Sequence, residues 1–331
     1  MRAPGFWWKR PGAAAALLSP FAVLYGRIAA RRLARTRARA GVPVICVGNP
    51  TVGGAGKTPT AIAVARLLIA AGERPMLLSR GYGGRLTGPE TVDPSRHRAA
   101  DVGDEPLLLA RTAPTVVARD RVAGAWHARE AGASVIVMDD GFQNPSLHKD
   151  LSILVVDGRR GVGNGRVIPA GPLRAPLDPQ LARANALLIV GELSDAGPVL
   201  ADARARGLPI FHGALEPDQA TVAALTGKPV LAFAGIGDPE KFFTTLAAAK
   251  IEAPIRRAFA DHRRYSSRDA DRLIIDAAKN SLQLLTTEKD LVRIRHDAPH
   301  LALMARALPV NLVVRETDAF NRLLLGALRG A

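Results

Sequence analysis

The 331-residue sequence predicts an α/β protein: a P-loop type parallel sheet domain, a second, smaller α/β domain and an N-terminal membrane-associating helix. Three observations predict this fold. Short apolar runs alternate with helical stretches, the pattern of parallel strands joined by crossover helices. The run Val44–Val47 leads into a glycine-rich loop that ends in Gly-Lys-Thr. The first 40 residues combine arginines with aromatic and apolar side chains.

The glycine-rich loop has the residue types that bind phosphate. Its glycines allow backbone N–H groups to wrap around phosphates, Lys57 would reach the β and γ oxygens, and the Thr58 hydroxyl would hold magnesium. The usual first glycine of such a loop is Thr51 here. An ordinary tight turn would leave Lys57 and Thr58 unexplained. We therefore predict that ATP and Mg²⁺ bind here, the nucleotide at Thr51, Val52, Gly53, Gly54, Ala55, Gly56, Lys57 and Thr58.

The apolar runs fall into two series along the chain. The first series is Val44–Val47, Pro75–Leu78, Thr115–Ala118, Val135–Met138, Leu151–Val156 and Ala186–Val190. The second series is Val230–Phe233, Ile255–Ala258, Gln283–Leu285 and Val310–Val314. We therefore expect a membrane-associating segment at 1–40, a nucleotide-binding domain at 41–203 and a second domain closing the cleft at 204–331. Residues 158–179, rich in Gly, Pro and Arg, are expected to form a long functional loop.

The N-terminal segment is strongly basic. It carries nine of the positive charges and no acid, within a formal net charge of +15. The 16 uncharged residues between Arg10 and Arg27, interrupted by Pro20, fall short of the roughly 20 needed to span a bilayer. Charge after the apolar part disfavours a secretory signal. The segment fits an anionic membrane surface, while a solvated or nucleic-acid-binding arm remains open from composition alone.

Composition favours a soluble catalytic part. Hydrophobic residues make up 48% of the chain. The single cysteine, Cys46, lies in the strand before the loop and excludes an intramolecular disulfide. Together with an ATP site, this predicts a cytoplasmic location for the catalytic part.

Acidic and basic side chains follow several expected strands. Asp139 and Asp140 end the run Val135–Met138, where a metal-binding acid of a P-loop protein belongs, although the pair could also cap a helix. Asp104 and Glu105 stand at an expected helix start, where acids are more often caps than catalysts. Arg80 lies in a glycine-rich segment that fits a ligand loop or a plain turn. His262 follows another strand and could move protons, but a lone histidine is usually structural.

Taken together and in order, these segments resemble the tetraacyldisaccharide 4'-kinase family, the lipid A 4'-kinases of Gram-negative bacteria. The likeness extends from the N-terminal segment to about Arg293. It rests on Gly48-Asn49, Gly53–Pro59, Ser79–Gly83, Gly103–Pro106, Asp139–Gln143, Pro169–Arg174, Asp261-His262 and Thr287–Asp290. The sequence departs from the family pattern at Asn144, where we expect His, and at Ala175, where we expect Glu.

The resemblance implies transfer of the ATP γ-phosphate to the 4'-hydroxyl of tetraacyldisaccharide 1-phosphate, giving lipid IVA. It also implies a peripheral location on the cytoplasmic face of the bacterial inner membrane, contact with anionic lipids and no nucleic-acid partner. Asp104 would accept the hydroxyl proton with help from His262, and Lys57 would act on the phosphates. We expect magnesium at Thr58, Asp139, Asp140 and Glu105, with further site candidates at Gln143, Arg80 and Arg174.

Two other functions fit parts of the sequence. A P-loop ATPase or GTPase switch with a basic nucleic-acid- or membrane-binding arm would hydrolyse nucleotide without a lipid acceptor and would not need His262. A non-enzymatic membrane adaptor would have a degraded nucleotide site, yet Lys57, Thr58 and Asp139 are intact. The kinase interpretation is therefore the prediction that the sequence favours.

Overall fold

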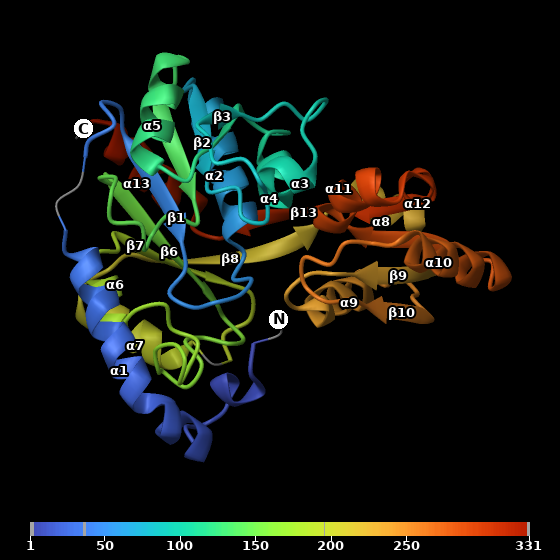
Figure 1. The fold of residues 1–331 in the computed structure, drawn as a ribbon, viewed down its shortest axis with the longest axis horizontal. Coiled ribbons are helices and arrows are strands. Elements are labelled where there is room, and N and C mark those ends of the chain that lie inside the picture. Colours follow the sequence, from blue (N-terminus) through green and yellow to red (C-terminus); the bar gives the residue numbers. More distant parts are fainter. Residues whose placement is uncertain (1–2, 36–37, 195, 330–331) are drawn as a thin grey trace.

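The structure is a computed structural model that describes residues 3–35, 38–194 and 196–329. Figure 1 shows a large sheet-containing domain, a smaller domain beside it, and a long N-terminal helix along one side of the large domain. Both domains are α/β, as the alternation of apolar runs and helical stretches predicts. The second series of strands is the part whose placement differs from expectation.

The large sheet contains nine strands within the described residues. Their order across the sheet is β13 (Val310–Val314), β8 (Ile210–Pro217), β7 (Ala186–Val190), β6 (Leu151–Asp157), β1 (Val44–Gly48), β5 (Val135–Asp139), β2 (Pro75–Ser79), β4 (Thr115–Val117) and β3 (Glu90–Thr91). The outer pairs β13–β8 and β3–β4 are antiparallel, and the inner pairs are parallel. The inner strands are buried on both faces because helices cover both.

Alternate residues of β1 face two separate cores. Val44 and Cys46 pack into one core, and Ile45 and Val47 into the other. The second of these cores is covered by α2 (Lys57–Ala70) and α13 (Thr317–Arg329). The first is covered by α5, α6 and α7. The remaining helices of this domain and of the chain start are η1 (Gly5–Trp8), α1 (Ala13–Leu33), α3 (Ala99–Val102), α4 (Asp104–Leu109), α5 (Arg121–Glu130), α6 (Leu177–Leu181) and α7 (Gly197–Ala205).

The second domain has a four-stranded parallel sheet within the described residues. Its strand order is β10 (Ile255–Ala258), β9 (Val230–Ala234), β11 (Gln283–Thr287) and β12 (Ala305–Leu308). Its helices are α8 (Gln219–Leu225), α9 (Pro239–Ala248), α10 (Ser267–Lys279), α11 (Glu288–Asp297) and α12 (Pro299–Met304). Apolar clusters lie on both faces of this sheet, so the domain has its own core.

The boundary expected at residues 203/204 does not coincide with the two sheets. Strand β8 continues the large sheet beside β7, and β13 returns from the second domain to pair with β8 in antiparallel fashion. Helix α13 then packs Phe320 and Leu324 into the core of the large domain. Val310–Val314 was expected in the second sheet because it follows the other strands of that series. Its antiparallel return is a long-range pairing that local sequence does not reveal.

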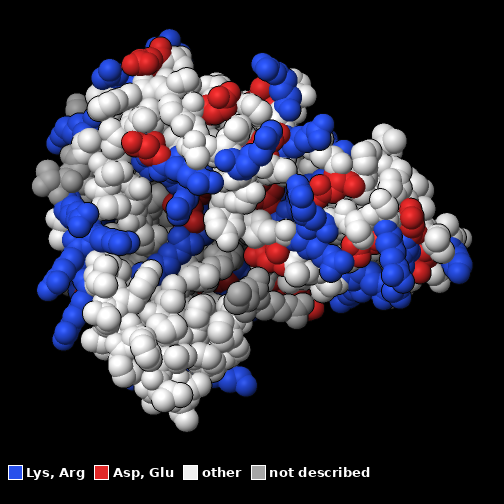
Figure 2. Space-filling model, viewed as in Figure 1, with Lys and Arg blue, Asp and Glu red and all other residues white. Residues whose placement is uncertain are grey.

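The N-terminal helix is longer than the apolar stretch suggested. Helix α1 runs through Pro20 for 21 residues, and by length and composition alone it could cross a membrane, with a mean hydropathy of 1.5. This differs from the expected 16-residue stretch. Its Gly26 lies against Pro176 at the start of α6, and several large apolar side chains on its other faces are exposed, including Leu17, Phe21 and Leu24. In Figure 2 the surface around the start of α1, at the lower left, is mostly uncharged, whereas Lys and Arg gather at the left edge, near the end of α1, and over the second domain.

Candidate active site

The phosphate loop joins the end of β1 to the start of α2. Gly53 and Gly56 have φ angles of 112° and 93°, a region that favours glycine. The Asn49 side-chain amide and the Lys57 ammonium both donate to the Gly53 carbonyl, at 3.3 Å and 3.4 Å. Burial lowers the pKa of Lys57, although Asp140 opposes this effect. The first N–H groups of a helix have no carbonyl partner within it, so the start of α2 at this loop, which has no side-chain cap, is suitable for an anion.

Thr58 and Asp139 meet at the base of this loop. The Thr58 hydroxyl donates to Asp139 Oδ2 at 3.1 Å, and both residues are buried. Burial, with the negative charges of Glu105 and Asp140, raises the pKa of Asp139 to about 7. Asp139 Oδ1 is buried without a hydrogen-bond partner among the described residues. An orphaned carboxylate oxygen beside a threonine hydroxyl is a donor set that fits magnesium.

Asp140 lies beside Asp139 but has different partners. Its φ of 52° turns the side chain toward Arg174, which donates to both carboxylate oxygens at 2.6 Å and 3.2 Å. Lys57 Nζ is 3.9 Å from the same carboxylate. Burial acts to raise the pKa of Asp140, but the charges of Lys57 and Arg174 outweigh it and hold the pKa below its ordinary value. Asp140 is therefore ionised and neutralised by two cations.

Arg174 and Gln143 form hydrogen bonds to the backbone of the segment that leads into the phosphate loop. Arg174 Nε donates to the Thr51 carbonyl at 3.0 Å, and its Nη1 reaches Gln143 Oε1 at 3.3 Å. The Gln143 amide donates to the Asn49 carbonyl at 2.8 Å. These bonds fix both ends of the segment between β1 and the glycines, so the loop is supported before any ligand binds.

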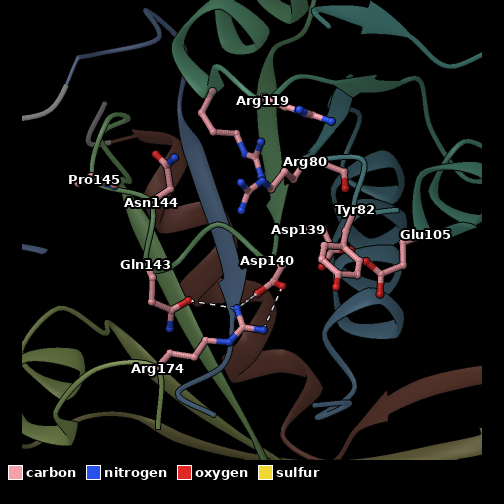
Figure 3. Close-up of a pocket in the computed structure, with 12 residues that line it drawn as sticks. Arg80, Tyr82, Glu105, Arg119, Asp139, Asp140, Gln143, Asn144, Pro145 and Arg174 are labelled. Carbon is pink, nitrogen blue, oxygen red and sulfur yellow. Dashed lines mark hydrogen bonds and ion pairs between the residues drawn. The ribbon is translucent and has the colours of Figure 1, made fainter. Parts of the chain in front are cut away.

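A cavity of about 450 Å³ opens beside these residues. In the view of Figure 3, Arg174 faces Asp140 and Gln143 on one side, and Arg80 and Arg119 lie on the opposite side. Arg121, at the start of α5, also lines the cavity, and its Nε is buried without a hydrogen-bond partner among the described residues. Burial and the nearby Arg80 lower the pKa of Arg121 to about 10. Arginines gathered at one wall suit a phosphorylated ligand.

Asp104 and His262 meet across the two domains. His262 Nδ1 lies 3.5 Å from Asp104 Oδ2, and the His262 ring is 5.3 Å from the Tyr82 ring. Burial acts to raise the pKa of Asp104, but the hydrogen bond to His262 and the charges of Arg293 and Lys289 hold that pKa well below its ordinary value. The same hydrogen bond raises the pKa of His262.

Arg293, which the sequence analysis did not assign to the site, supports this pair. Its Nε donates to Asp104 Oδ2 at 2.8 Å, and its Nη1 donates to the Gly235 carbonyl at 2.6 Å and to Asp290 at 3.1 Å. Arg293 and Asp290 are buried. The sequence signal that could have identified Arg293 is helical spacing, because Arg293 follows Lys289 by one helical turn in the segment after β11.

Glu105 has a basic partner in the structure. Lys289 Nζ binds Glu105 Oε1 at 2.7 Å, again across the two domains. Glu105, Asp139 and Asp140 line the same cavity, so the expected metal-binding acids are neighbours. Within the described chain no group of three or more His, Cys, Asp or Glu side chains is arranged to hold a metal. A magnesium ion here would therefore need phosphate oxygens as further ligands.

The two departures from the family pattern have local roles. The Asn144 side chain accepts from the Ser146 backbone N–H and hydroxyl at 3.0 Å and 2.7 Å, at the rim of the cavity. Ala175 is buried, and its carbonyl accepts from Gln180 at 2.7 Å. The other expected residues form two neighbouring groups. Lys57 and Thr58 contact Asp140 and Asp139, which line the cavity, whereas Asp104 and His262 meet each other where the two domains touch.

The fold and this site define a P-loop nucleotide-binding protein of two α/β domains. The family model described as Tetraacyldisaccharide-1-P 4'-kinase matches residues 14–329. The chain is 57% identical to the tetraacyldisaccharide 4'-kinase of Nitrobacter winogradskyi, covering 99% of this chain and 98% of that one. It is 55% identical to that of Rhodopseudomonas palustris strain BisB18, covering 96% and 93%.

A solved structure agrees with these sequence relatives. The crystal structure of LpxK from Aquifex aeolicus in complex with ATP is similar with a TM-score of 0.74 at 27% identity, covering 95% of this chain and 99% of that one. The chain belongs to the tetraacyldisaccharide 4'-kinase family. The resemblance and the fold class expected from the sequence are confirmed.

Proposed function

We propose that this protein transfers the γ-phosphate of ATP to the 4'-hydroxyl of tetraacyldisaccharide 1-phosphate, giving lipid IVA in lipid A biosynthesis. The observation that carries this proposal is the meeting of Asp104 and His262, from different domains. Tyr82, whose ring lies near His262, lines the cavity, and Glu105, next to Asp104 in the chain, is close enough to Lys57 of the phosphate loop to affect its pKa. A hydrolase or switch has no need for a proton acceptor contributed jointly by two domains.

The phosphate loop would bind and orient ATP. Backbone N–H groups of the loop and the Lys57 ammonium would contact the phosphates, and Arg174 would keep the loop and Asp140 in place. Thr58 and Asp139 would hold Mg²⁺, with Asp140 and Glu105 close by. When bound, that ion neutralises charge on the β and γ phosphate oxygens.

Asp104 would accept the proton of the attacking hydroxyl. Oxygen at the sugar 4'-position would form a bond to the γ-phosphorus while the bond to the β–γ bridging oxygen breaks and ADP leaves. His262 and Arg293 hold the Asp104 carboxylate in place, so the proton acceptor is already ionised and oriented. A low pKa makes Asp104 a weak base, which suits a loose transition state in which proton transfer comes late.

The cavity and the N-terminal helix would receive the lipid. The arginine-lined wall suits an acceptor that itself carries a phosphate, and the exposed apolar side chains of α1 suit its acyl chains and an anionic membrane surface. This arrangement agrees with a peripheral location on the cytoplasmic face of the bacterial inner membrane.

The direct test is incubation of the purified protein with ATP, Mg²⁺ and tetraacyldisaccharide 1-phosphate in detergent micelles. We expect a lipid product with one additional phosphate and one ADP per product, detected by mass spectrometry and a coupled assay. Nucleotide hydrolysis at the same rate with and without the lipid would contradict the proposal and favour an ATPase or GTPase switch.

A further inference from the structure

Two ammonium groups, one from each domain, donate hydrogen bonds to backbone carbonyls of the phosphate loop. Lys57 Nζ donates to the Gly53 carbonyl at 3.4 Å, and Lys241 Nζ donates to the next carbonyl, Gly54, at 3.2 Å. Lys57 begins α2, whereas Lys241 belongs to the first turn of α9 in the second domain. Lys57 has an accepted role in loops of this kind, and nothing in the site described so far uses Lys241.

Ion pairs between the two domains hold Lys241 next to the phosphate loop. It binds Asp157, the last residue of β6, which lies next to β1 in the large sheet. In the same turn Asp238 binds Arg159 and Arg160, the latter at 2.8 Å. Asp238 and Lys241, at the start of α9, therefore each meet the opposite charge at the end of β6 or directly after it. These ion pairs place the start of α9 beside Gly54 of the phosphate loop.

We propose that Lys241 is a phosphate-binding residue that the second domain supplies to ATP. Under this proposal, Asp157 and the Gly54 carbonyl are the partners of Lys241 when no nucleotide is bound. A phosphate oxygen is a stronger acceptor for an ammonium group than a backbone carbonyl. The Lys241 side chain is 30% exposed and unbranched, so its ammonium group can pivot from the Gly54 carbonyl toward a ligand within the loop.

The proposal assigns a use for this charge during transfer. As the acceptor oxygen bonds to the γ-phosphorus and ADP departs, negative charge is shared among the γ-phosphoryl oxygens and the bridging oxygen. A second fixed cation beside Lys57 would stabilise that charge. Because Lys241 comes from the second domain, its contact would also make tight ATP binding depend on the position of that domain. The inference rests on the proposed function only in requiring a nucleoside triphosphate as the ligand.

Binding of ATP and ADP distinguishes this role from simple attachment of the two domains. We expect Lys241→Met to weaken binding of a non-hydrolysable ATP analogue about tenfold by calorimetry, with ADP affinity changed less than about twofold. Lys241→Arg should restore most of the affinity. Lys250→Met, in the exposed residue just after α9, is the matched control and should bind both nucleotides normally.

The variant Asp157→Asn provides a second test of whether Lys241 binds phosphate or only attaches the domains. If Lys241 serves the phosphate, loss of Asp157 should leave analogue binding equal or tighter, because the competing partner is gone. If Lys241 only attaches the domains, Lys241→Met and Asp157→Asn should cause equal losses and the double variant should be no worse. That result, or equal weakening of ADP and the ATP analogue, would overturn the proposal.

The nucleotide measurements need no lipid acceptor. Absence of lipid phosphorylation by the parent protein would therefore contradict the proposed function while leaving this inference to be decided by the calorimetry. With an active parent protein, Lys241→Met should lower kcat about 10²-fold, and an unchanged kcat would contradict the proposed role during transfer.

Discussion

Two adjacent acids at the end of β5, Asp139 and Asp140, have opposite electrostatic environments. Asp139 is buried beside Thr58, and one of its oxygens has no hydrogen-bond partner in the described part of the chain, whereas Asp140 is neutralised by Arg174 and Lys57. The pKa of Asp139 is raised and that of Asp140 is lowered. We infer that Asp139 is the acid available to a cation, and that Asp140 orders the loop through its two basic partners.

Lys57→Ala should reduce turnover at least about 10²-fold, because one fixed charge is removed from a site that works by electrostatic positioning. Lipid phosphorylation measured at saturating ATP tests this prediction. Lys228→Ala, an exposed lysine after α8, is the control and should retain activity. Turnover within a few-fold of the parent for Lys57→Ala would contradict the assignment of the phosphate loop.

Asp104→Asn should lower kcat more than His262→Ala, by about 10² or more for the base. The two residues act as one unit, so the double variant should be little worse than Asp104→Asn alone. Asparagine is preferred to alanine here because it leaves a partner for the buried Arg293 guanidinium. Calorimetry should show normal ATP binding in all three variants. Multiplicative losses, or lost ATP affinity in Asp104→Asn, would instead assign Asp104 to the metal site.

Asp139 should make the stability of the ligand-free protein fall as pH rises. Its folded pKa of about 7 is above the ordinary value of 3.8, so between these values the folded protein holds a proton that the unfolded chain has released. The contribution is complete below about pH 4 and is lost as pH rises through about 7, a change on the order of 2–4 kcal/mol. The free energy of unfolding, measured with urea from pH 4.5 to 7.5, should depend less on pH in Asp139→Asn than in the parent protein. The exposed control Asp202→Asn should show the same pH dependence as the parent.

At the scale of single elements, apolar runs were reliable guides to buried strands. Ala186–Val190 is buried throughout and has the bounds that the sequence predicted. Ile255–Ala258 also has the predicted bounds, although it is a mostly exposed strand at the edge of the smaller sheet. Strand β8 was missed because Ile210–Pro217 is only partly buried and contains polar residues. Helix α1 extends beyond the 16-residue uncharged stretch that the sequence shows, because arginines continue its last turns on the exposed side.

Site residues that follow a strand or a glycine-rich loop could be predicted from sequence, because local order puts them at one edge of a sheet. Lys241 and Arg293 could not be predicted in this way. Their partners Gly54 and Asp104 are 187 and 189 residues away along the chain. Such contacts depend on how the second domain lies against the first, which no local pattern records.

Helix α1 should attach the protein to membranes through its exposed apolar face. Leu17, Phe21 and Leu24 are 78%, 65% and 62% exposed, so replacing all three with Glu should release the protein from anionic vesicles without disturbing its core. Vesicle co-sedimentation measures this effect. Leu303→Glu, at a 90% exposed position on α12, is the control and should still bind. Release by the control but not by the triple variant would move the membrane contact to the second domain.

At the scale of the whole molecule, the site depends on both domains being present in one arrangement. Lys289 and Arg293 bind the acids of α4, and Lys241 and Asp238 bind residues at the end of β6 and directly after it. The first set includes Glu105, which lines the cavity, and the second lies beside Gly54 of the phosphate loop. Since each is an ion pair, raised salt should weaken the exposed ones first and leave the buried pair of Arg293 and Asp104 intact.

The pairing of β8 with β13 makes the second domain an insertion with neighbouring entry and exit points. Pro217 and Val310 are register partners, and the Asp218 N–H donates to the Pro309 carbonyl at 2.9 Å. Residues 218–309 could therefore be excised and replaced by a two-residue Asn-Gly turn, which joins antiparallel strands. The shortened protein should fold cooperatively and still bind ADP, yet transfer almost no phosphate, because it lacks His262, Arg293 and Lys241 together. Thermal unfolding and ADP calorimetry would check this, and an unfolded product would mean that the large sheet requires its inserted neighbour.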